Sequence, residues 1–214
     1  MNEKEALFLG TMLGDGYMCI SNTKQGPKYF IGICGHIEED RAFLLDIIRP
    51  IFFNLSKKLP RIEEQPSESV LRLVIQSKNL LFSLNKEWEL PIGKSRTRKI
   101  KDEFTNSPSI MKNIIAGFFA TDGSLVITNN NGTMYPRIEF QNISEEILHQ
   151  IKNFLSTLGL NGGLYKMNRK NPDRIVYRLQ YNGKQNLLKF EKEIGFINPK
   201  HKLKFEEFKI EMLG

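Results

Sequence analysis

The chain has 214 residues, 40% of them hydrophobic and 26% charged, so it can bury a core as one large domain or two small ones. Its formal net charge of +7 suits a polyanionic partner but does not identify one. Its two cysteines give no disulfide framework, its N-terminus lacks a signal-peptide pattern, and no apolar run approaches the ~20 residues of a membrane span. We therefore expect an intracellular protein with no membrane partner, in the cytoplasm of a prokaryote or in an organelle.

The first predicted element is a helix that begins near Asn2, where Asn2 and Glu5 fit a capping box. Two strands, "YMCI" and "YFIGIC", should then form a hairpin around the polar loop "SNTKQGPK". An amphipathic helix follows in "EEDRAFLLDIIRPIF", and Pro50 is expected to end it. A second hairpin, "RIEEQ" with "VLRLVIQ", leads to a short helix near Asn79.

A basic segment comes next, with five Lys or Arg residues within Lys94–Lys101. Two interpretations stay open, a solvated linker and a contact with a phosphate backbone. Beyond it the same order of elements returns. We expect a helix capped by Ser107, the hairpin "SLVI" and "RIEFQ", a helix capped by Ser144 and ended by Gly159, the hairpin "GGLYKMN" and "RIVYRLQY", and a short helix near Asn186.

The two series of elements coincide when the sequence is shifted by 107 residues, which places Asp15 on Asp122 and Gly10 on Gly117. We therefore predict an N-terminal half at 1–93, a basic linker at 94–106 and a C-terminal half at 107–214. Each half reads αββαββα. Antiparallel strands with helices on one face make the expected fold class α+β.

The first helix of each half carries small residues four positions apart, Gly10 and Gly14 in one and Gly117 and Thr121 in the other. Glycine inside a helix costs roughly 1 kcal/mol relative to alanine, and close packing against another backbone compensates for that cost. Packing of these two helices would bring Asp15 and Asp122 together. Two close carboxylates repel unless a cation lies between them, and hard divalent cations prefer oxygen ligands. The alternative is that each Asp-Gly pair merely ends a helix in a turn.

At these positions the sequence resembles the LAGLIDADG homing endonucleases. "FLGTMLGDG" (8–16) and "IAGFFATDG" (115–123) lie over the nine-residue family motif, although its sixth place holds Leu13 and Ala120 instead of an acidic residue. The resemblance implies a monomer with internal pseudo-dimer symmetry, in which the motif helices form the interface and the two curved antiparallel sheets form a DNA-binding saddle.

The same resemblance implies Mg²⁺ as cofactor, with Ca²⁺ or Mn²⁺ able to take its place. Asp15, Asp122 and the carbonyls of Gly14 and Thr121 would be its ligands. The implied activity is a double-strand break with short 3′ overhangs in a long, loosely palindromic DNA target, for the homing of a mobile intron. A start at Met without flanking splicing motifs favours a free-standing, intron-encoded enzyme.

The family also places a polar residue at the end of the second strand, beside the catalytic water. Asn142 matches it in the second half, whereas the first half has Gly35, with His36 beside it. A basic residue on the fourth strand is a further family feature, for which Arg72 and Gln180 lie in the right stretch and Lys78 and Lys184 are rivals.

One face of each sheet should be free to contact DNA, since the other packs on helices. The predicted contacts in the first half are Asn22, Lys24, Gln25, Lys28, Arg61, Glu63, Gln65 and Arg72. Those in the second half are Ser124, Asn129, Arg137, Glu139, Gln141, Lys166, Asn168, Arg169, Arg174, Arg178 and Gln180.

Two other functions stay open on the sequence alone. One is a maturase that assists the splicing of an intron RNA, and the other is a DNA-binding module that has lost cleavage.

Overall fold

The computed structural model describes residues 1–167 and 175–213. The first sheet has the strand order β1-β2-β4-β3. The elements of this part are α1 (Glu3–Gly14), β1 (Gly16–Thr23), β2 (Gly26–His36), the π-helical segment η1 (Phe43–Ile48), α2 (Arg49–Ser56), β3 (Arg61–Gln65), the 3₁₀ turn η2 (Pro66–Glu68), β4 (Val70–Gln76) and α3 (Lys78–Trp88).

The second sheet repeats this topology, with the order β5-β6-β8-β7. Its strands and the surrounding helices are α4 (Asp102–Thr105), α5 (Pro108–Asp122), β5 (Gly123–Asn130), β6 (Thr133–Asn142), α6 (Glu145–Thr157), β7 (Gly163–Met167), β8 (Val176–Asn182), α7 (Lys184–Glu193) and α8 (Pro199–Leu213). All strand pairs in both sheets are antiparallel, which confirms the predicted α+β class.

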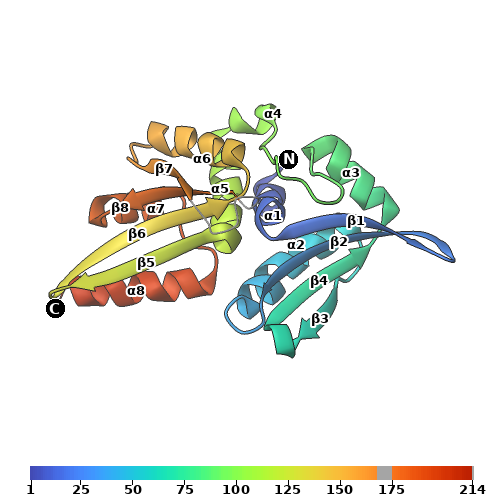
Figure 1. Cartoon of the computed structure of the whole chain (residues 1–214), viewed down its shortest axis with the longest axis horizontal. Coiled ribbons are helices and arrows are strands. Elements are labelled where there is room, and N and C mark those ends of the chain that lie inside the picture. Colours follow the sequence, from blue (N-terminus) through green and yellow to red (C-terminus); the bar gives the residue numbers. More distant parts are fainter. Residues whose placement is uncertain (168–174, 214) are drawn as a thin grey trace.

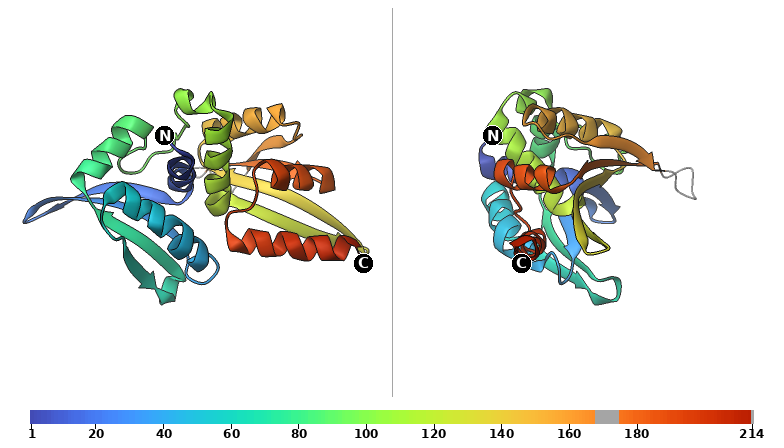
Figure 2. Two further views of the ribbon diagram at one scale, coloured as in Figure 1. Left: turned by 180° about the vertical axis from the view of Figure 1, so that it is seen from behind. Right: turned by 90° about the vertical axis from the view of Figure 1, so that its left-hand side faces the viewer.

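Helices α1 and α5 lie side by side at the centre of the molecule, and the two sheets extend to either side of them (Figure 1). Seen from behind, α2, α7 and α8 lie in front of the sheets (Figure 2, left). The buried side chains of α1 and α5 join those of both sheets in one hydrophobic cluster. Among the described residues, no helix lies over the opposite face of either sheet (Figure 1).

Several helix ends follow from local sequence chemistry. Asn2 and Glu5 form the predicted capping box at the start of α1. Gly159 lies just beyond α6 with φ +77°, a conformation that suits glycine. Ser107 and Ser144 occupy the predicted N-cap positions of α5 and α6, although neither makes a side-chain hydrogen bond to its own helix. The Ser144 hydroxyl instead binds the backbone of Arg98.

Pro50 does not end the helix that precedes it, contrary to the sequence prediction. The chain runs through η1 directly into α2, and Pro50 lies in the first turn of α2. The residues just before Pro50 are wound as a π-helix, in which the regular hydrogen-bond pattern of an α-helix is already interrupted, and the helical run can therefore continue past the proline. Among the described residues, no helix is long and apolar enough to cross a membrane.

Candidate metal and nucleic-acid site

The close approach of α1 and α5 depends on their small residues. A Cβ added to Gly10 would lie 2.0 Å from the carbonyl oxygen of Ile114, and one added to Gly117 would lie 2.1 Å from that of Leu7. One turn further on, a Cβ on Gly14 would lie 2.1 Å from Oγ1 of Thr121. The two helices therefore pack backbone to backbone, and a larger side chain at these glycines would force them apart.

This packing brings the C-terminal ends of the two helices together. Asp15 is the residue that ends α1, and Asp122 is the last residue of α5. A Cβ on Gly14, the residue before Asp15, would lie only 3.5 Å from Cγ of Asp122. In keeping with this proximity, the Asp15 carboxylate contributes to a raised pKa at Asp122. The structure thus brings together four residues singled out from the sequence, Gly14, Asp15, Thr121 and Asp122.

A residue at the end of strand β6 forms a hydrogen bond with Asp122. The amide of Asn142, at the end of β6, donates a hydrogen bond of 2.5 Å to Oδ2 of Asp122. The amide oxygen of Asn142 in turn accepts from the backbone N–H of Ser144 at 2.8 Å, which fixes its orientation. Burial and the neighbouring Asp15 raise the pKa of Asp122 to about 7, although Asn142 and Arg98 oppose the rise.

Asp15 has different surroundings and is open to solvent on one side. The protein packed around it raises the pKa of its carboxyl, and the carboxylate of Asp40 adds to this rise. Lys200 and Arg98 act in the opposite direction. Among the described residues, no side chain donates a hydrogen bond to the Asp15 carboxylate, so the first half lacks an equivalent of the contact that Asn142 makes.

Arg98, in the basic linker, enters this site and was missed by the sequence analysis. Its guanidinium donates hydrogen bonds to the carbonyl oxygens of Leu13 at 2.8 Å and Gly14 at 3.0 Å, at the end of α1. A cation is favourable there because a helix C-terminus carries partial negative charge. The side chain is also within electrostatic reach of both Asp15 and Asp122. Arg98 therefore supplies positive charge between the two halves.

The donor atoms suit a hard divalent cation. Two carboxylates from α1 and α5 repel one another, which is part of the reason why the pKa of Asp122 is raised, and a cation between them would remove that repulsion. No group of three or more His, Cys, Asp or Glu side chains lies together within residues 1–167 and 175–213. The remaining ligands would thus have to be water, main-chain carbonyls or phosphate oxygens, which is the coordination that Mg²⁺ prefers.

The pairing of β4 and β8 with their neighbouring strands changes one predicted correspondence between the two halves. Arg72 of β4 pairs with Cys34, and Arg178 of β8 pairs with Gln141, which is the residue equivalent to Cys34. Arg178, and not Gln180, is therefore the counterpart of Arg72. Neither arginine is among the groups that shift the pKa of the two aspartates. The rival lysines, Lys78 and Lys184, are the first residues of α3 and α7.

Most of the predicted DNA contacts lie on the faces of the sheets that no helix covers. Strand pairing places Arg61, Glu63, Gln65, Arg72 and Lys28 on this open face of the first sheet, and Ser124, Arg137, Glu139, Gln141, Arg178 and Gln180 on that of the second. Glu139 is buried there, because ion pairs with Arg137 and Arg178 cover its carboxylate. Tyr17 and Tyr165 share these open faces and were not foreseen.

Three residues predicted to lie on the open face of a sheet lie on its other face. Asn22 lies on the same face of β1 as the buried Met18, and Asn129 lies on the same face of β5 as the buried Leu125. Lys166 pairs with Tyr177 on the face that packs against the helices. Lys24 and Gln25 lie at the turn between β1 and β2 and are exposed. The remaining three, Asn168, Arg169 and Arg174, lie outside the described residues.

Comparisons with known proteins agree with this architecture. Residues 109–195 match the family model described as a LAGLIDADG-like domain. A protein named tRNA-splicing ligase RtcB from Pyrococcus furiosus is 27% identical over 93% of this chain, and one of the same name from Methanopyrus kandleri is 23% identical over 89%. The chain spans only about a fifth of the length of these curated relatives, 22% and 20%.

Solved structures of homing endonucleases cover nearly the whole chain. A mesophilic variant of I-DmoI is 16% identical, covers 90% of this chain and 95% of its own, and gives a TM-score of 0.65. I-SmaMI, bound to an uncleaved DNA target with calcium ions, is 13% identical, covers 100% of this chain and 91% of its own, and gives 0.66. Residues 109–195 thus match a LAGLIDADG-like domain, and the whole chain has the fold seen in the homing endonuclease I-DmoI and in I-SmaMI.

Proposed function

We propose that this protein is a site-specific DNA endonuclease that makes a double-strand break by metal-assisted hydrolysis. The observation that carries the proposal is the meeting of Asp15 and Asp122, from equivalent positions of two repeated halves, at the junction of two open sheet faces. The wider fold supports it, because a neighbour with a TM-score of 0.66 is bound to an uncleaved DNA target. Homing of a mobile intron is the biological setting that we propose for this break.

In this proposal Asp15 and Asp122 bind the divalent cation, and the carbonyls of Gly14 and Thr121 are further candidates. When bound, Mg²⁺ would supply Lewis-acid activation of water and of the scissile phosphate. The chain's own groups do the rest. Asn142 orients Asp122 and can hold a water beside it. Arg98 adds positive charge between the halves, where a phosphate would carry negative charge.

The open sheet faces would hold the DNA on either side of this centre. Arg61 and Arg72 in the first sheet, and Arg137 and Arg178 in the second, carry the donors that read guanine in the major groove. Their ion pairs with Glu63, Glu68 and Glu139 orient the guanidinium groups in advance. Because the two faces carry different side chains, we propose a target whose half-sites differ.

The decisive experiment is selection of cut sites. The purified chain is incubated with a random or genomic DNA library and Mg²⁺, and the ends that form are sequenced. We expect a unique consensus with short 3′ overhangs. On the selected target, Asp15→Asn and Asp122→Asn should each lose double-strand cleavage by at least about a hundredfold while they still bind the target in Ca²⁺.

Asp46→Asn serves as the matched control, because this aspartate is exposed on η1, away from the ends of α1 and α5. It should cleave as the wild type does. Intact library DNA after incubation with Mg²⁺ and with Mn²⁺ would instead identify a DNA-binding module without cleavage. Full double-strand cleavage by both aspartate variants would contradict the two-acid site.

A further inference from the structure

Two acidic residues of the described chain are buried, Asp40 with 9% and Glu139 with 4% of the residue exposed. A buried carboxylate is costly unless opposite charges or hydrogen bonds compensate it, so each of the two needs partners that account for it. The partners of the two acids differ, and so does the role that each acid can have.

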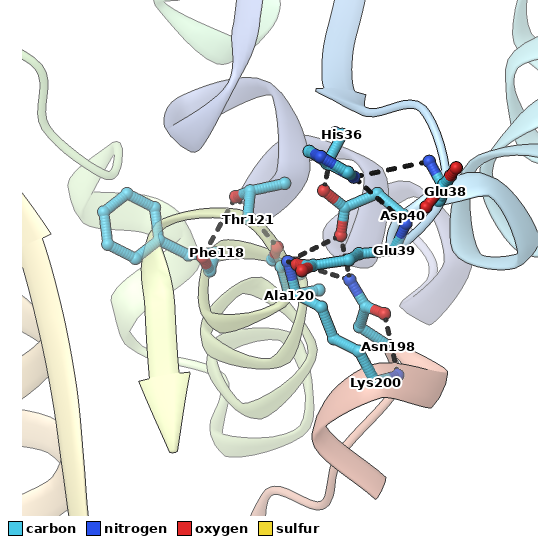
Figure 3. A network of polar contacts seen from close by, with 10 residues as sticks. His36, Glu38, Glu39, Asp40, Phe118, Ala120, Thr121, Asn198 and Lys200 are labelled. Carbon is cyan, nitrogen blue, oxygen red and sulfur yellow. Dashed lines mark hydrogen bonds and ion pairs between the residues drawn. The ribbon is translucent and has the colours of Figure 1, made fainter. Parts of the chain in front are cut away.

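Asp40 is fully used in joining the two halves of the molecule (Figure 3). Its Oδ2 accepts from the backbone N–H of His36 at 2.8 Å, and its Oδ1 accepts from the side-chain amide of Asn198 at 2.7 Å and pairs with the ammonium of Lys200 at 2.7 Å. The same amide also donates to the carbonyl oxygen of Ala120 at 2.9 Å. These contacts account for the burial of Asp40 as a structural link between the halves.

Glu139 is buried in a different setting, on the open face of the second sheet between two arginines. Arg137 lies two residues before it on β6, and Arg178 lies two residues before its partner on β8, Gln180. Oε1 of Glu139 forms an ion pair with Nε of Arg137, and Oε2 lies 3.6 Å from Nε of Arg178. One carboxylate therefore faces two guanidinium groups, and the three residues together carry a single net positive charge.

The same edge of each guanidinium faces the carboxylate. The Nε atoms of Arg137 and Arg178 are shielded from solvent, whereas the two side chains keep 31% and 26% of their surface exposed. A guanidinium has five N–H donors, so pairing through Nε leaves the two Nη groups of each arginine for other partners. The side chain of Glu139 is only 5% exposed, so a DNA base would meet the arginines and not the carboxylate.

The first sheet has no such group of charges at the equivalent place. The shift of 107 residues and the strand pairing place Gly32 at the position of Glu139. The same shift places Phe30 at the position of Arg137. A Cβ on Gly32 would lie 2.3 Å from Cζ of Tyr17, so an aromatic ring covers the place that the carboxylate occupies in the second sheet. The buried acid and its arginines therefore distinguish the second half from the first.

We propose that Glu139 is a specificity-determining positioning residue, which holds Arg137 and Arg178 in one conformation so that they contact base edges and not phosphates. An arginine that is free to move can pair with the phosphate backbone, which carries no sequence information. An arginine held at its Nε edge loses less conformational freedom when its Nη donors meet guanine. The inference rests on the proposed function, because it names the residue that sets specificity on the proposed DNA surface.

The test is a comparison of affinities for three kinds of duplex, measured in Ca²⁺ at several salt concentrations: the selected target, its single-base-pair variants and a scrambled duplex. Glu139→Gln should lower the discrimination against the base-pair variants by about tenfold at the positions that the two arginines contact. It should also raise the affinity for the scrambled duplex about threefold and steepen its dependence on the logarithm of the salt concentration by about one. Specific and non-specific binding thus change in opposite directions.

Glu207→Gln is the matched control, because it removes the same charge from an exposed position on α8, on the helix side of the sheets. It should change neither the discrimination nor the affinity for the scrambled duplex. A merely structural role of Glu139 would weaken the binding of all duplexes together. That result, or a discrimination that Glu139→Gln leaves unchanged, overturns the proposal.

Variants of the arginines identify the base pairs concerned, and they test the proposal even where Glu139→Gln does not fold. Arg137→Lys and Arg178→Lys keep the charge but lack the planar fork, so each should lose base preference while it binds the scrambled duplex within about twofold of the wild type. The positions that they affect should be those that Glu139→Gln affects. Lysine variants that keep every base preference of the wild type overturn the proposal.

A double variant shows whether Glu139 acts through the arginines. Arg137→Lys combined with Glu139→Gln should lose no more discrimination at the positions of Arg137 than Arg137→Lys alone. Losses that add at those positions would mean that Glu139 reads a base itself, which overturns the proposal. A wild-type chain that selects no target contradicts the proposed function as well, whereas a selected target with the base preferences unchanged in Glu139→Gln contradicts only this inference.

Discussion

Asp122 and Asp15 have the same side chain but different surroundings, and the difference has a measurable consequence for stability. Burial and Asp15 raise the pKa of Asp122 from 3.8 to about 7. The folded protein therefore holds this proton up to about pH 7, whereas the unfolded chain loses it near the ordinary value. The stability that results is fully present below pH 3.8 and is lost as the pH rises toward 7.

We predict that, in EDTA, the free energy of unfolding of the wild type falls relative to that of Asp122→Asn between pH 4.5 and pH 7.5. The slope of this difference should not exceed about 1.4 kcal/mol per pH unit, the limit for one proton. Urea unfolding of both proteins across this range measures it. Excess Mg²⁺ at pH 7.5 should reverse the loss. A difference that does not change with pH would contradict the assignment of the raised pKa to Asp122.

Individual residues show which contacts of the site could be predicted from the sequence and which could not. Asn142 could be placed beside Asp122 because the repeat and the strand end fix its position locally. Arg98 could not, because its guanidinium contacts residues more than eighty positions away. Gly35 pointed to a missing side chain, but only the turn before η1 brings the side chain of Asp40 over that strand end. Contacts that depend on long-range packing leave no local pattern.

At the scale of elements, the pair α1 and α5 organises the molecule, and its glycines make a second prediction. Gly10→Ala should destabilise the protein by about 2 kcal/mol or more, because the new methyl group meets the carbonyl of Ile114, which cannot move aside. In an unpacked helix the same change would stabilise by about 1 kcal/mol. Gly14→Ala should destabilise similarly, since its methyl group meets the side chain of Thr121.

Thr121→Gly supplies the control for this prediction. Added to Gly14→Ala it should recover most of the lost stability, because it removes the side chain that blocks the methyl group. Added to Gly10→Ala it should recover none, since the obstacle there is backbone. Denaturant unfolding of the single and double variants makes the comparison. Equal recovery in both pairs would contradict the packing described for α1 and α5.

The order of elements was predictable because each hairpin and helix has local signals, namely alternation, turn residues and caps. Element ends were less predictable. Pro50 marked an expected stop that the chain passes through in the first turn of α2. Ser144 had the chemistry of a cap, yet its hydroxyl binds Arg98 of the linker. In both cases the residue type suited the predicted role, but a tertiary contact or the position of the residue in the helix determined the role that it has.

At the scale of the whole molecule, the central claim is that two repeated halves build one metal site on DNA. A crystal of the protein with its selected DNA target and Mn²⁺ tests this claim most directly, through the anomalous scattering of the metal. The account predicts an Mn²⁺ ion coordinated by the carboxylates of both Asp15 and Asp122 and by a phosphate oxygen of the target. Mn²⁺ bound to neither aspartate, or to only one of them in every copy, would contradict it.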